Sequence, residues 1–274
     1  MSGVLEEARE VTAPAARPPR RRRRGRGAFL ALAAMVVPVG ASMVHLEISL
    51  LDVAWAVPDF ARFLVENMWP PEFHELEDLL IATLVTVEMA YLGTIAATLV
   101  SLPLSLLAAR NLTTHPTLFA LTRSVVMVCR AVPDFVFALM FVAALGLGPL
   151  PGVLGVAIHS VGMLGKLYAE RIEEVDPGPG EALAAVGATK LQVVRLAVIP
   201  QVLPSIVANT LYRFDINIRS SIILGIVGAG GIGYELVTAL QALDYQRAAA
   251  VMVIVLALVI VVEAVSNRIR KHYL

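Results

Sequence analysis

Several stretches of this chain are apolar over about 20 residues, the length that an α-helix needs to cross the hydrocarbon core of a bilayer. They are residues 28–46, 80–102, 124–147, 152–168, 202–224 and 247–265. The stretches are continuously apolar and lack the alternation of polar and apolar residues that is typical of membrane strands, which favours helices over a barrel. We therefore predict an all-α, polytopic membrane protein with about six transmembrane helices.

The composition agrees with a membrane environment. Of the 274 residues, 58% are hydrophobic and only 16% are charged, which is too apolar for an ordinary soluble domain. The fourth and fifth stretches are the weakest candidates, because the fourth is short and rich in glycine and the fifth contains charged residues. The residues concerned are Gly152, Gly155, Gly162 and Gly165 in the fourth, and Arg213, Asp215 and Arg219 in the fifth.

Residues 1–27 combine prolines and a block of arginines with few bulky apolar residues, a composition that predicts a disordered basic cytoplasmic tail. Because the arginines directly precede the first apolar stretch, the expected partner is the anionic membrane surface and not nucleic acid. A cleaved signal peptide with a small-residue site near residues 40–42 is the alternative. The length of residues 28–46 favours a membrane span instead.

The charges of the loops predict the orientation in the membrane. Residues 47–78 hold eight acids and a single arginine, Arg62, whereas residues 103–123 hold Arg110 and Arg123 and no acid. The chain also ends in a basic segment, Arg268 to Leu274. Since cytoplasmic loops carry an excess of Lys and Arg, we expect both termini in the cytoplasm and residues 47–78 outside.

The connection between the fourth and fifth stretches, residues 170–200, is long and only moderately polar. Residues 177–180 alternate Pro and Gly, and residues 181–186 are strong helix formers that Gly187 terminates. Thr189 followed by Gln192 predicts a capping box that opens a second helix. A short helix at this place would give a soluble motor a surface to push on, and an ordinary loop is the alternative.

This connection resembles the cytoplasmic signature of the permeases of ATP-binding-cassette (ABC) importers, which runs Glu-Ala-Ala, three residues, Gly, nine residues, Ile-x-Leu-Pro. The chain has Glu181-Ala182-Leu183, then Gly187, then Ala197-Val198-Ile199-Pro200. The spacings match, and the departures exchange one apolar residue for another. By this resemblance Glu181, Ala182, Gly187 and Pro200 are the residues that couple the chain to an ATPase.

Further stretches resemble the phosphonate permeases within that class. They are residues 130–135 (RAVPDF), 165–170 (GKLYAE), 174–183 (EVDPGPGEAL), 211–220 (LYRFDINIRS) and 227–236 (VGAGGIGYEL). The resemblance covers about residues 80–274 and implies a type I ABC importer bundle. The expected organisation is the tail 1–27, a first transmembrane helix with an outward-facing acidic loop over 28–78, and a permease core over 79–274 with the coupling loop 170–200.

The resemblance also implies the partners and the place of the protein. They are a second copy of the permease enclosing one central path, two cytoplasmic ATPase subunits and an extracytoplasmic phosphonate-binding protein, in a bacterial inner membrane. The sequence contains no Gly-x4-Gly-Lys-[Ser/Thr] phosphate loop, so the chain does not itself supply an ATPase of that kind and is not expected to be an enzyme. Phosphonate, phosphite and phosphate all remain open as the substrate.

Three arginines in apolar stretches, Arg213, Arg219 and the weaker candidate Arg130, are predicted to give the translocation path its preference for an anion. An arginine near mid-membrane costs roughly 2.5–3.5 kcal/mol on insertion scales, so it usually faces a bundle interior or a watery cavity. The alternative is local pairing, because Asp134 lies four residues after Arg130 and Asp215 four residues before Arg219. Arg213 has no acid at that spacing and is predicted to be the unpaired charge, unless another helix supplies an acid.

Other patterns carry little functional weight. Residues 228–233 satisfy the dinucleotide fingerprint Gly-x-Gly-x-x-Gly, but they follow a membrane span and not a strand, so a tight turn or close helix contact is expected. The five histidines are scattered and Cys129 is the single cysteine, so neither a metal site nor a cofactor is predicted. No catalytic constellation is found.

The rival function is a secondary transporter or channel for small anions. Such a protein is expected to show broken helices at corresponding places in its two halves, and the sequence does not show them. A membrane-embedded enzyme or a purely structural subunit is the second rival.

Overall fold

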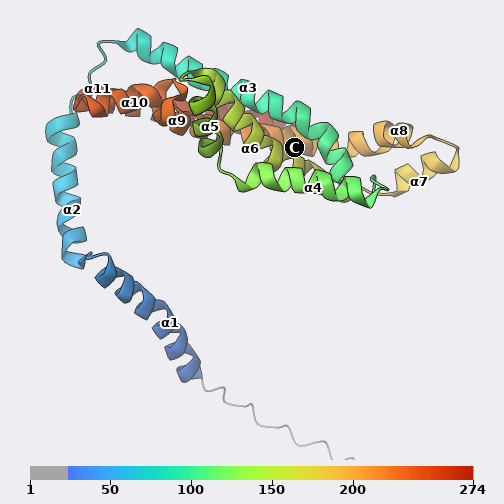
Figure 1. Cartoon of the computed structure of the whole chain (residues 1–274), viewed down its shortest axis with the longest axis horizontal. Helices are drawn as coiled ribbons and strands as arrows, with labels where there is room; N and C mark the ends of the chain where they lie inside the picture. The colour runs from blue at the N-terminus through green and yellow to red at the C-terminus, as the bar shows by residue number, and fades with distance from the viewer. Residues whose placement is uncertain (1–23, 274) are drawn as a thin grey trace, which may run out of the picture. The chain divides into compact units, whose positions relative to one another are not determined.

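The computed structural model describes residues 24–273, and every regular element among them is helical (Figure 1). The prediction of an all-α fold is therefore confirmed. The predicted disorder of the tail 1–27 falls almost wholly outside the described residues. The α-helices are α1 (Arg24–His45), α2 (Leu50–Phe63), α3 (Leu76–Ala108), α4 (Pro116–Ala131), α5 (Asp134–Leu145), α6 (Pro149–Glu173), α7 (Gly178–Ala185), α8 (Lys190–Val193), α9 (Ile199–Leu224), α10 (Ile232–Gln241) and α11 (Tyr245–Tyr273). Three π-helical turns join them: η1 (Leu64–Met68), η2 (Val194–Val198) and η3 (Gly225–Ala229).

Four helical stretches in the described part are long and apolar enough to cross a membrane. They are Leu76–Ala108, Pro149–Glu173, Lys190–Ala229 and Tyr245–Ile269. They include the second, fourth, fifth and sixth predicted stretches. The first predicted stretch contains a shorter apolar helix, Leu32–His45.

The third predicted stretch, residues 124–147, is not one helix. Its two parts, α4 and α5, are bent by 85° at a short break. Val132 is extended there (φ −91°, ψ 126°) because the ring of Pro133 disfavours the helical conformation of the residue before it. Residues 24–273 thus contain four spans, or five when this bent pair is taken as one.

The chain divides into two compact units, residues 1–62 and 63–274. In the first unit, the described side chains of α1 and α2 are mostly exposed. The second unit contains α3 to α11 and the buried core.

The helix α6 is the centre of the second unit and packs against α3, α4, α5 and α9. The glycines of α6 allow the backbones of these helices to pack closely against it. A Cβ atom on Gly155 would lie 2.9 Å from the main-chain nitrogen of Ala138, and a Cβ atom on Gly162 would clash with the main chain of Arg130. The fourth predicted stretch, one of the two that looked weakest in sequence, is thus the most buried of the four spans, because small residues let neighbouring backbones approach.

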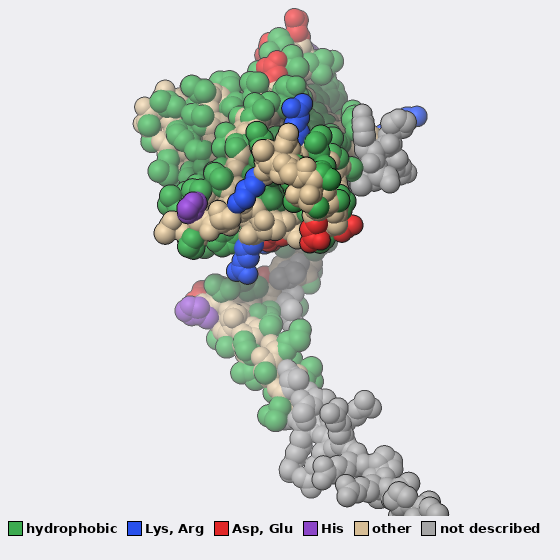
Figure 2. All heavy atoms as spheres, turned by 90° about the vertical axis from the view of Figure 1, so that its right-hand side faces the viewer, with side chains coloured by type: hydrophobic (Ala, Val, Ile, Leu, Met, Phe, Trp, Pro, Cys, Tyr) green, Lys and Arg blue, Asp and Glu red, His purple; other side chains and the backbone are tan. Residues whose placement is uncertain are grey.

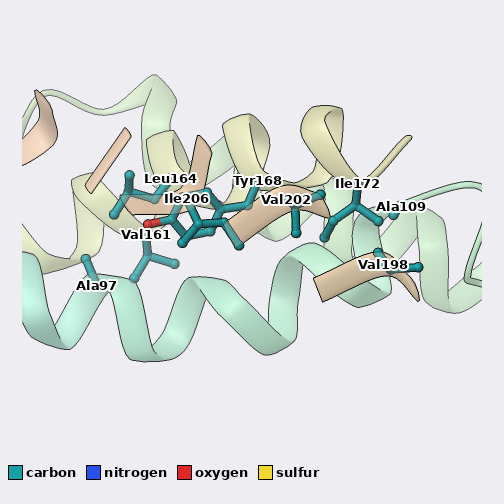
Figure 3. Packing of buried hydrophobic residues seen from close by; sticks show 9 residues of the cluster. All are labelled: Ala97, Ala109, Val161, Leu164, Tyr168, Ile172, Val198, Val202 and Ile206. Carbon is teal, nitrogen blue, oxygen red and sulfur yellow. The ribbon is translucent and has the colours of Figure 1, made fainter. Parts of the chain in front are cut away.

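The largest apolar cluster joins α3, α6 and the beginning of α9. Figure 3 shows its side chains meeting between the three helices, with the Tyr168 ring among the aliphatic groups. The members are Ala97, Ala109, Val161, Leu164, Tyr168, Ile172, Val198, Val202 and Ile206. This cluster fixes the end of α6 against the start of α9, and so positions the connection between them.

Candidate functional site

A chain of hydrogen-bonded polar side chains joins α3, α6 and α9 in the core. Asn217 Nδ2 donates to Thr94 Oγ1 at 2.8 Å, and Ser160 Oγ donates to Asn217 Oδ1 at 3.1 Å. Arg213 Nε donates to Ser160 Oγ at 2.9 Å, and all four side chains are buried. A buried polar group is costly unless it is hydrogen-bonded, so these contacts hold the three helices in one register.

Arg213 is the charged end of this chain of contacts. Its side chain is only 5% exposed, and its second terminal nitrogen, Nη2, has no hydrogen-bond partner among the described residues. Arg213 makes no ion pair within the described part of the chain, and no acid at a spacing of three or four residues lies beside it on α9.

Arg219 lies on a different face of α9 from Arg213. It forms an ion pair with Asp215, as the spacing of four residues predicts. The Asp215 side chain is 10% exposed and the Arg219 side chain is 50% exposed. Of the two arginines on α9, Arg219 is the one that other molecules can reach.

The alternative interpretation of Arg130, local pairing with Asp134, is wrong. The two residues would share a helix face only if the helix continued, and it ends at Ala131 and starts again at Asp134. Arg130 makes no ion pair within the part of the chain that the structure describes. It lines a cavity beside α6 together with Arg123 and Lys166.

Residues 170–200, the predicted coupling loop, are called the coupling segment below. They contain the short helix predicted from sequence. The helix α7 begins at Gly178, three residues earlier than expected, because Pro179 occupies its first turn, where a missing N–H costs nothing. Glu181 lies in this first turn, and Ala182 follows it.

Gly187 terminates α7 with a Schellman motif. Its φ is +88°, its N–H donates to the carbonyl of Ala184 at 3.0 Å, and the N–H of Ala188 donates to the carbonyl of Leu183 at 3.0 Å. A side chain at Gly187 would meet nothing within 4 Å. Glycine is therefore required here by the backbone and not by packing within the chain.

The predicted capping box is present. Thr189 Oγ1 accepts from the N–H of Gln192, and the side chain of Gln192 accepts from the N–H of Thr189 at 2.7 Å. The helix that opens here runs through η2 directly into α9, so Pro200 lies in the first turn of α9, within the continuous helical stretch Lys190–Ala229. The non-helical connection is consequently much shorter than the predicted loop 170–200.

Large apolar side chains are exposed along the coupling segment. Val186 is 81% exposed, Leu191 76% and Leu196 60%. Figure 2, which views the molecule from the side where α7 and α8 lie in Figure 1, shows hydrophobic side chains over much of the visible face with Lys and Arg among them. Leu191 and Leu196 lie in the stretch Lys190–Ala229, which is apolar enough to cross a membrane, whereas Val186 lies outside it, where an exposed apolar side chain is typical of an interaction site.

The glycine-rich segment after α9 forms the tight turn and the close contact that its composition predicts. Gly228, Gly230 and Gly231 have positive φ, and a Cβ atom on Gly233 would clash with the main-chain carbonyl of Ile222. Thr86 Oγ1 on α3 accepts from the N–H of Ile232 at 2.8 Å and fixes the start of α10.

Thr94, Ser160 and Asn217 were not among the site residues predicted from the sequence. They lie far apart in the chain, and only the structure brings them together. The one available signal was Asn217 itself, a side-chain amide inside an apolar stretch, which needs a partner on another helix.

Comparison with known proteins agrees with this architecture. Residues 101–273 match the family described as "Binding-protein-dependent transport system inner membrane component". The chain belongs to this family. It is a permease subunit of the ABC importer class, and the predicted resemblance is confirmed.

Two relatives illustrate the similarity. The "Phosphate-import permease protein PhnE" of Mycolicibacterium smegmatis is 46% identical over 76% of this chain and 39% of the relative. The "Phosphite transport system permease protein PtxC" of Stutzerimonas stutzeri is 43% identical over 79% of this chain and 78% of the relative. The chain thus spans well under half of the first relative's length but most of the second's.

Solved structures share the fold at low sequence identity. A chain of the "MetNI methionine ABC transporter" in an inward-facing conformation matches with a TM-score of 0.63 and 20% identity, over 73% of this chain and 99% of that chain. A chain of a bacterial ABC transporter "involved in the import of the acidic polysaccharide alginate" matches with a TM-score of 0.56 and 16% identity, over 88% and 96%. The fold of the second unit is therefore that of ABC importer permeases, as predicted.

Proposed function

We propose that this permease imports phosphonate or a related phosphorus oxyanion, with phosphite and phosphate as the other members of the class. The similarity to permeases named for phosphate and phosphite import, at 46% and 43% identity over three quarters or more of the chain, carries this proposal. At this level of identity, the core side chains that shape the transport path are expected to be shared between this chain and these relatives.

The arginines of α9 support an anionic substrate. Arg219 is half-exposed on a span, where a charge turned toward lipid is costly, so we place it against a watery path. Arg213 is buried, and its part in this proposal is to hold α9 in place and to contribute a positive field. Arg130 belongs to a separate basic cavity and remains the weaker candidate for the path.

The proposed complex contains two copies of the permease, two ATPase subunits and an extracytoplasmic phosphonate-binding protein. We propose that Glu181, Ala182 and Gly187 form the docking surface for the ATPase, and that α9, whose first turn contains Pro200, receives its movement. The exposed apolar side chain of Val186, directly after α7, supports this assignment. The energy for import then comes from ATP hydrolysed by the partner subunits.

The proposed location is the bacterial inner membrane, with both termini in the cytoplasm and residues 47–78 outside. This orientation requires α1 to cross the membrane as a sixth span, beside the five counted among the described residues. The arginine-rich start, the basic end and the acidic segment 47–78 support this orientation. In this arrangement the coupling segment faces the cytoplasm, where the ATPase is.

ATP hydrolysis by the assembled complex tests the proposal. The permease, its cognate ATPase and its binding protein are placed in nanodiscs, and hydrolysis is measured with methylphosphonate, phosphite, phosphate or no anion. We expect at least one of the three anions to raise the rate in the presence of the binding protein. An identical rate with all three anions and without them contradicts the proposed substrate class.

A further inference from the structure

Three basic side chains line one cavity of about 160 Å³ between α4, α6 and the end of α3. They are Arg123, Arg130 and Lys166, and the remaining lining residues are small or apolar. Among the described residues no acid lines this cavity. A water molecule takes about 30 Å³ of liquid, so the cavity has room for a tetrahedral anion.

The acids nearby do not balance these cations. Arg123 Nη2 pairs with Glu173 Oε1 at 2.7 Å, and Lys166 Nζ pairs with Glu170 Oε1 at 3.3 Å. Neither acid lines the cavity, and Arg130 has no ion pair in the described part of the chain. Two of the three cations are thus paired, and the charge of Arg130 is left without an acid beside this cavity.

The cations are arranged in a column along the seam between the two helices. Arg123 and Arg130 are seven residues apart on α4, which places them on the same face about 10 Å apart along the axis. Lys166 lies one turn beyond Gly162, whose α-carbon packs directly against the backbone of Arg130. Lys166 therefore lies on α6 beside the α4 segment that carries the two arginines.

The side chain of Arg123 is held in place by contacts with Ala108 and Phe119. Its Nε donates to the carbonyl of Ala108 at 3.0 Å, and its guanidinium lies 4.9 Å from the centre of the Phe119 ring. Its Nε and Nη2 are engaged by Ala108 and Glu173, so Nη1 is the nitrogen left to donate to an anion. Together with the other two cations of the cavity it suits the several oxygens of a phosphate group.

We propose that this cavity is a binding site for a phosphate-type anion on the α4–α6 seam of the permease. Two sources share this chemistry: the transported phosphonate and the phosphate of an anionic phospholipid headgroup. The first source rests on the proposed function, and the second does not.

The test uses the complete permease with its ATPase in nanodiscs and two variants of the cavity, Arg130→Gln and Lys166→Gln. Arg171→Gln is the matched control, because Arg171 lies on α6 and pairs with Glu174 at 2.7 Å but does not line the cavity. In one arm the discs contain only phosphatidylcholine, and the affinity for methylphosphonate is measured by titration. In the other arm the discs also contain phosphatidylglycerol, and native mass spectrometry counts the molecules retained.

Losing a charge-assisted hydrogen bond is expected to weaken binding about tenfold or more in at least one arm. Both cavity variants should show this loss, and Arg171→Gln should bind like the unmodified protein. A loss in the first arm identifies the substrate as the ligand, and a loss confined to the second identifies the lipid. If the cavity variants match Arg171→Gln in both arms, the site is refuted.

Uptake by the unmodified complex shows whether the cavity proposal or the proposed function is wrong. If the unmodified complex imports methylphosphonate and the cavity variants bind both probes normally, the cavity proposal is wrong and the function stands. If the complex imports none of the phosphorus oxyanions and the cavity variants lose phosphatidylglycerol, the function is wrong and the site stands as a lipid site.

Discussion

Arg213 Nε on α9 donates a hydrogen bond to Ser160 Oγ on α6, 2.9 Å away, inside the helix bundle. Arg213, which has no acid at a spacing of three or four residues, is thus hydrogen-bonded to the central helix α6. Ser160 in turn donates to Asn217, and Asn217 donates to Thr94. The charged side chain of α9 is therefore linked by hydrogen bonds to α6 and α3.

Replacing Asn217 by leucine is expected to destabilise the bundle by about 1–3 kcal/mol. The change leaves Thr94 and Ser160 without their shared partner, and a buried polar group left unsatisfied costs about that much, with smaller values typical of membrane helices. The measurement is the midpoint of thermal unfolding in detergent. Thr238→Val is the control, since it removes one exposed hydrogen bond within α10, and an equal midpoint for both variants contradicts the prediction.

Replacing Arg219 by glutamine is expected to lower import about tenfold while the complex assembles normally. Arg219 is half-exposed, and a charge-assisted hydrogen bond to the anion is worth about 1.5–3 kcal/mol. Arg213→Gln is expected to act differently and to reduce the yield of assembled complex, because its side chain is buried and bonded to Ser160. If both variants assemble and import at the unmodified rate, neither arginine serves the path.

Three different substitutions at Gly187 distinguish the effect of backbone strain from the effect of lost contact with the ATPase. Gly187→Ala costs about 1–2 kcal/mol because φ is +88°, and Gly187→Asn should cost less because Asn tolerates this region. Gly187→Trp adds bulk that points into open space in this chain, so any further effect comes from a partner. We expect Ala and Asn to retain import and Trp to leave ATP hydrolysis uncoupled from it. Normal import with normally stimulated ATP hydrolysis in the Trp variant refutes the proposed docking surface.

Cysteine labelling tests the orientation. With Cys129 replaced by serine, Asp59→Cys and Asn267→Cys each give a single reactive thiol at an exposed position. Asn267 is preferred to the adjacent Ser266, whose side chain is buried. An impermeant maleimide added to intact cells should label the cysteine at 59 and spare the one at 267. The opposite pattern reverses the proposed topology.

Local signals made much of this fold predictable. The capping box at Thr189 and Gln192, the termination at Gly187 and the pairing of Asp215 with Arg219 all depend on residues at most four positions apart, and all are present. The break at Val132 also had a local signal, the following Pro133, which the apolar pattern of residues 124–147 concealed.

Contacts between distant residues were not predictable from the sequence. The bond from Asn217 to Thr94 joins residues 123 positions apart, and no periodic pattern marks either one. The glycines of α6 made its stretch look weak, although close approach of α4 and α5 is what buries it. Such features depend on which helices meet, and a single sequence read for hydropathy does not contain that information.

Import of radiolabelled methylphosphonate into proteoliposomes tests the central claim most directly. The vesicles contain the permease with its cognate ATPase, ATP inside and the binding protein outside. The account predicts accumulation that requires both ATP and the binding protein, and that unlabelled phosphonate, phosphite or phosphate inhibits. Accumulation by the permease alone under an ion gradient, or no accumulation of any of the three anions by a complex that hydrolyses ATP, contradicts it.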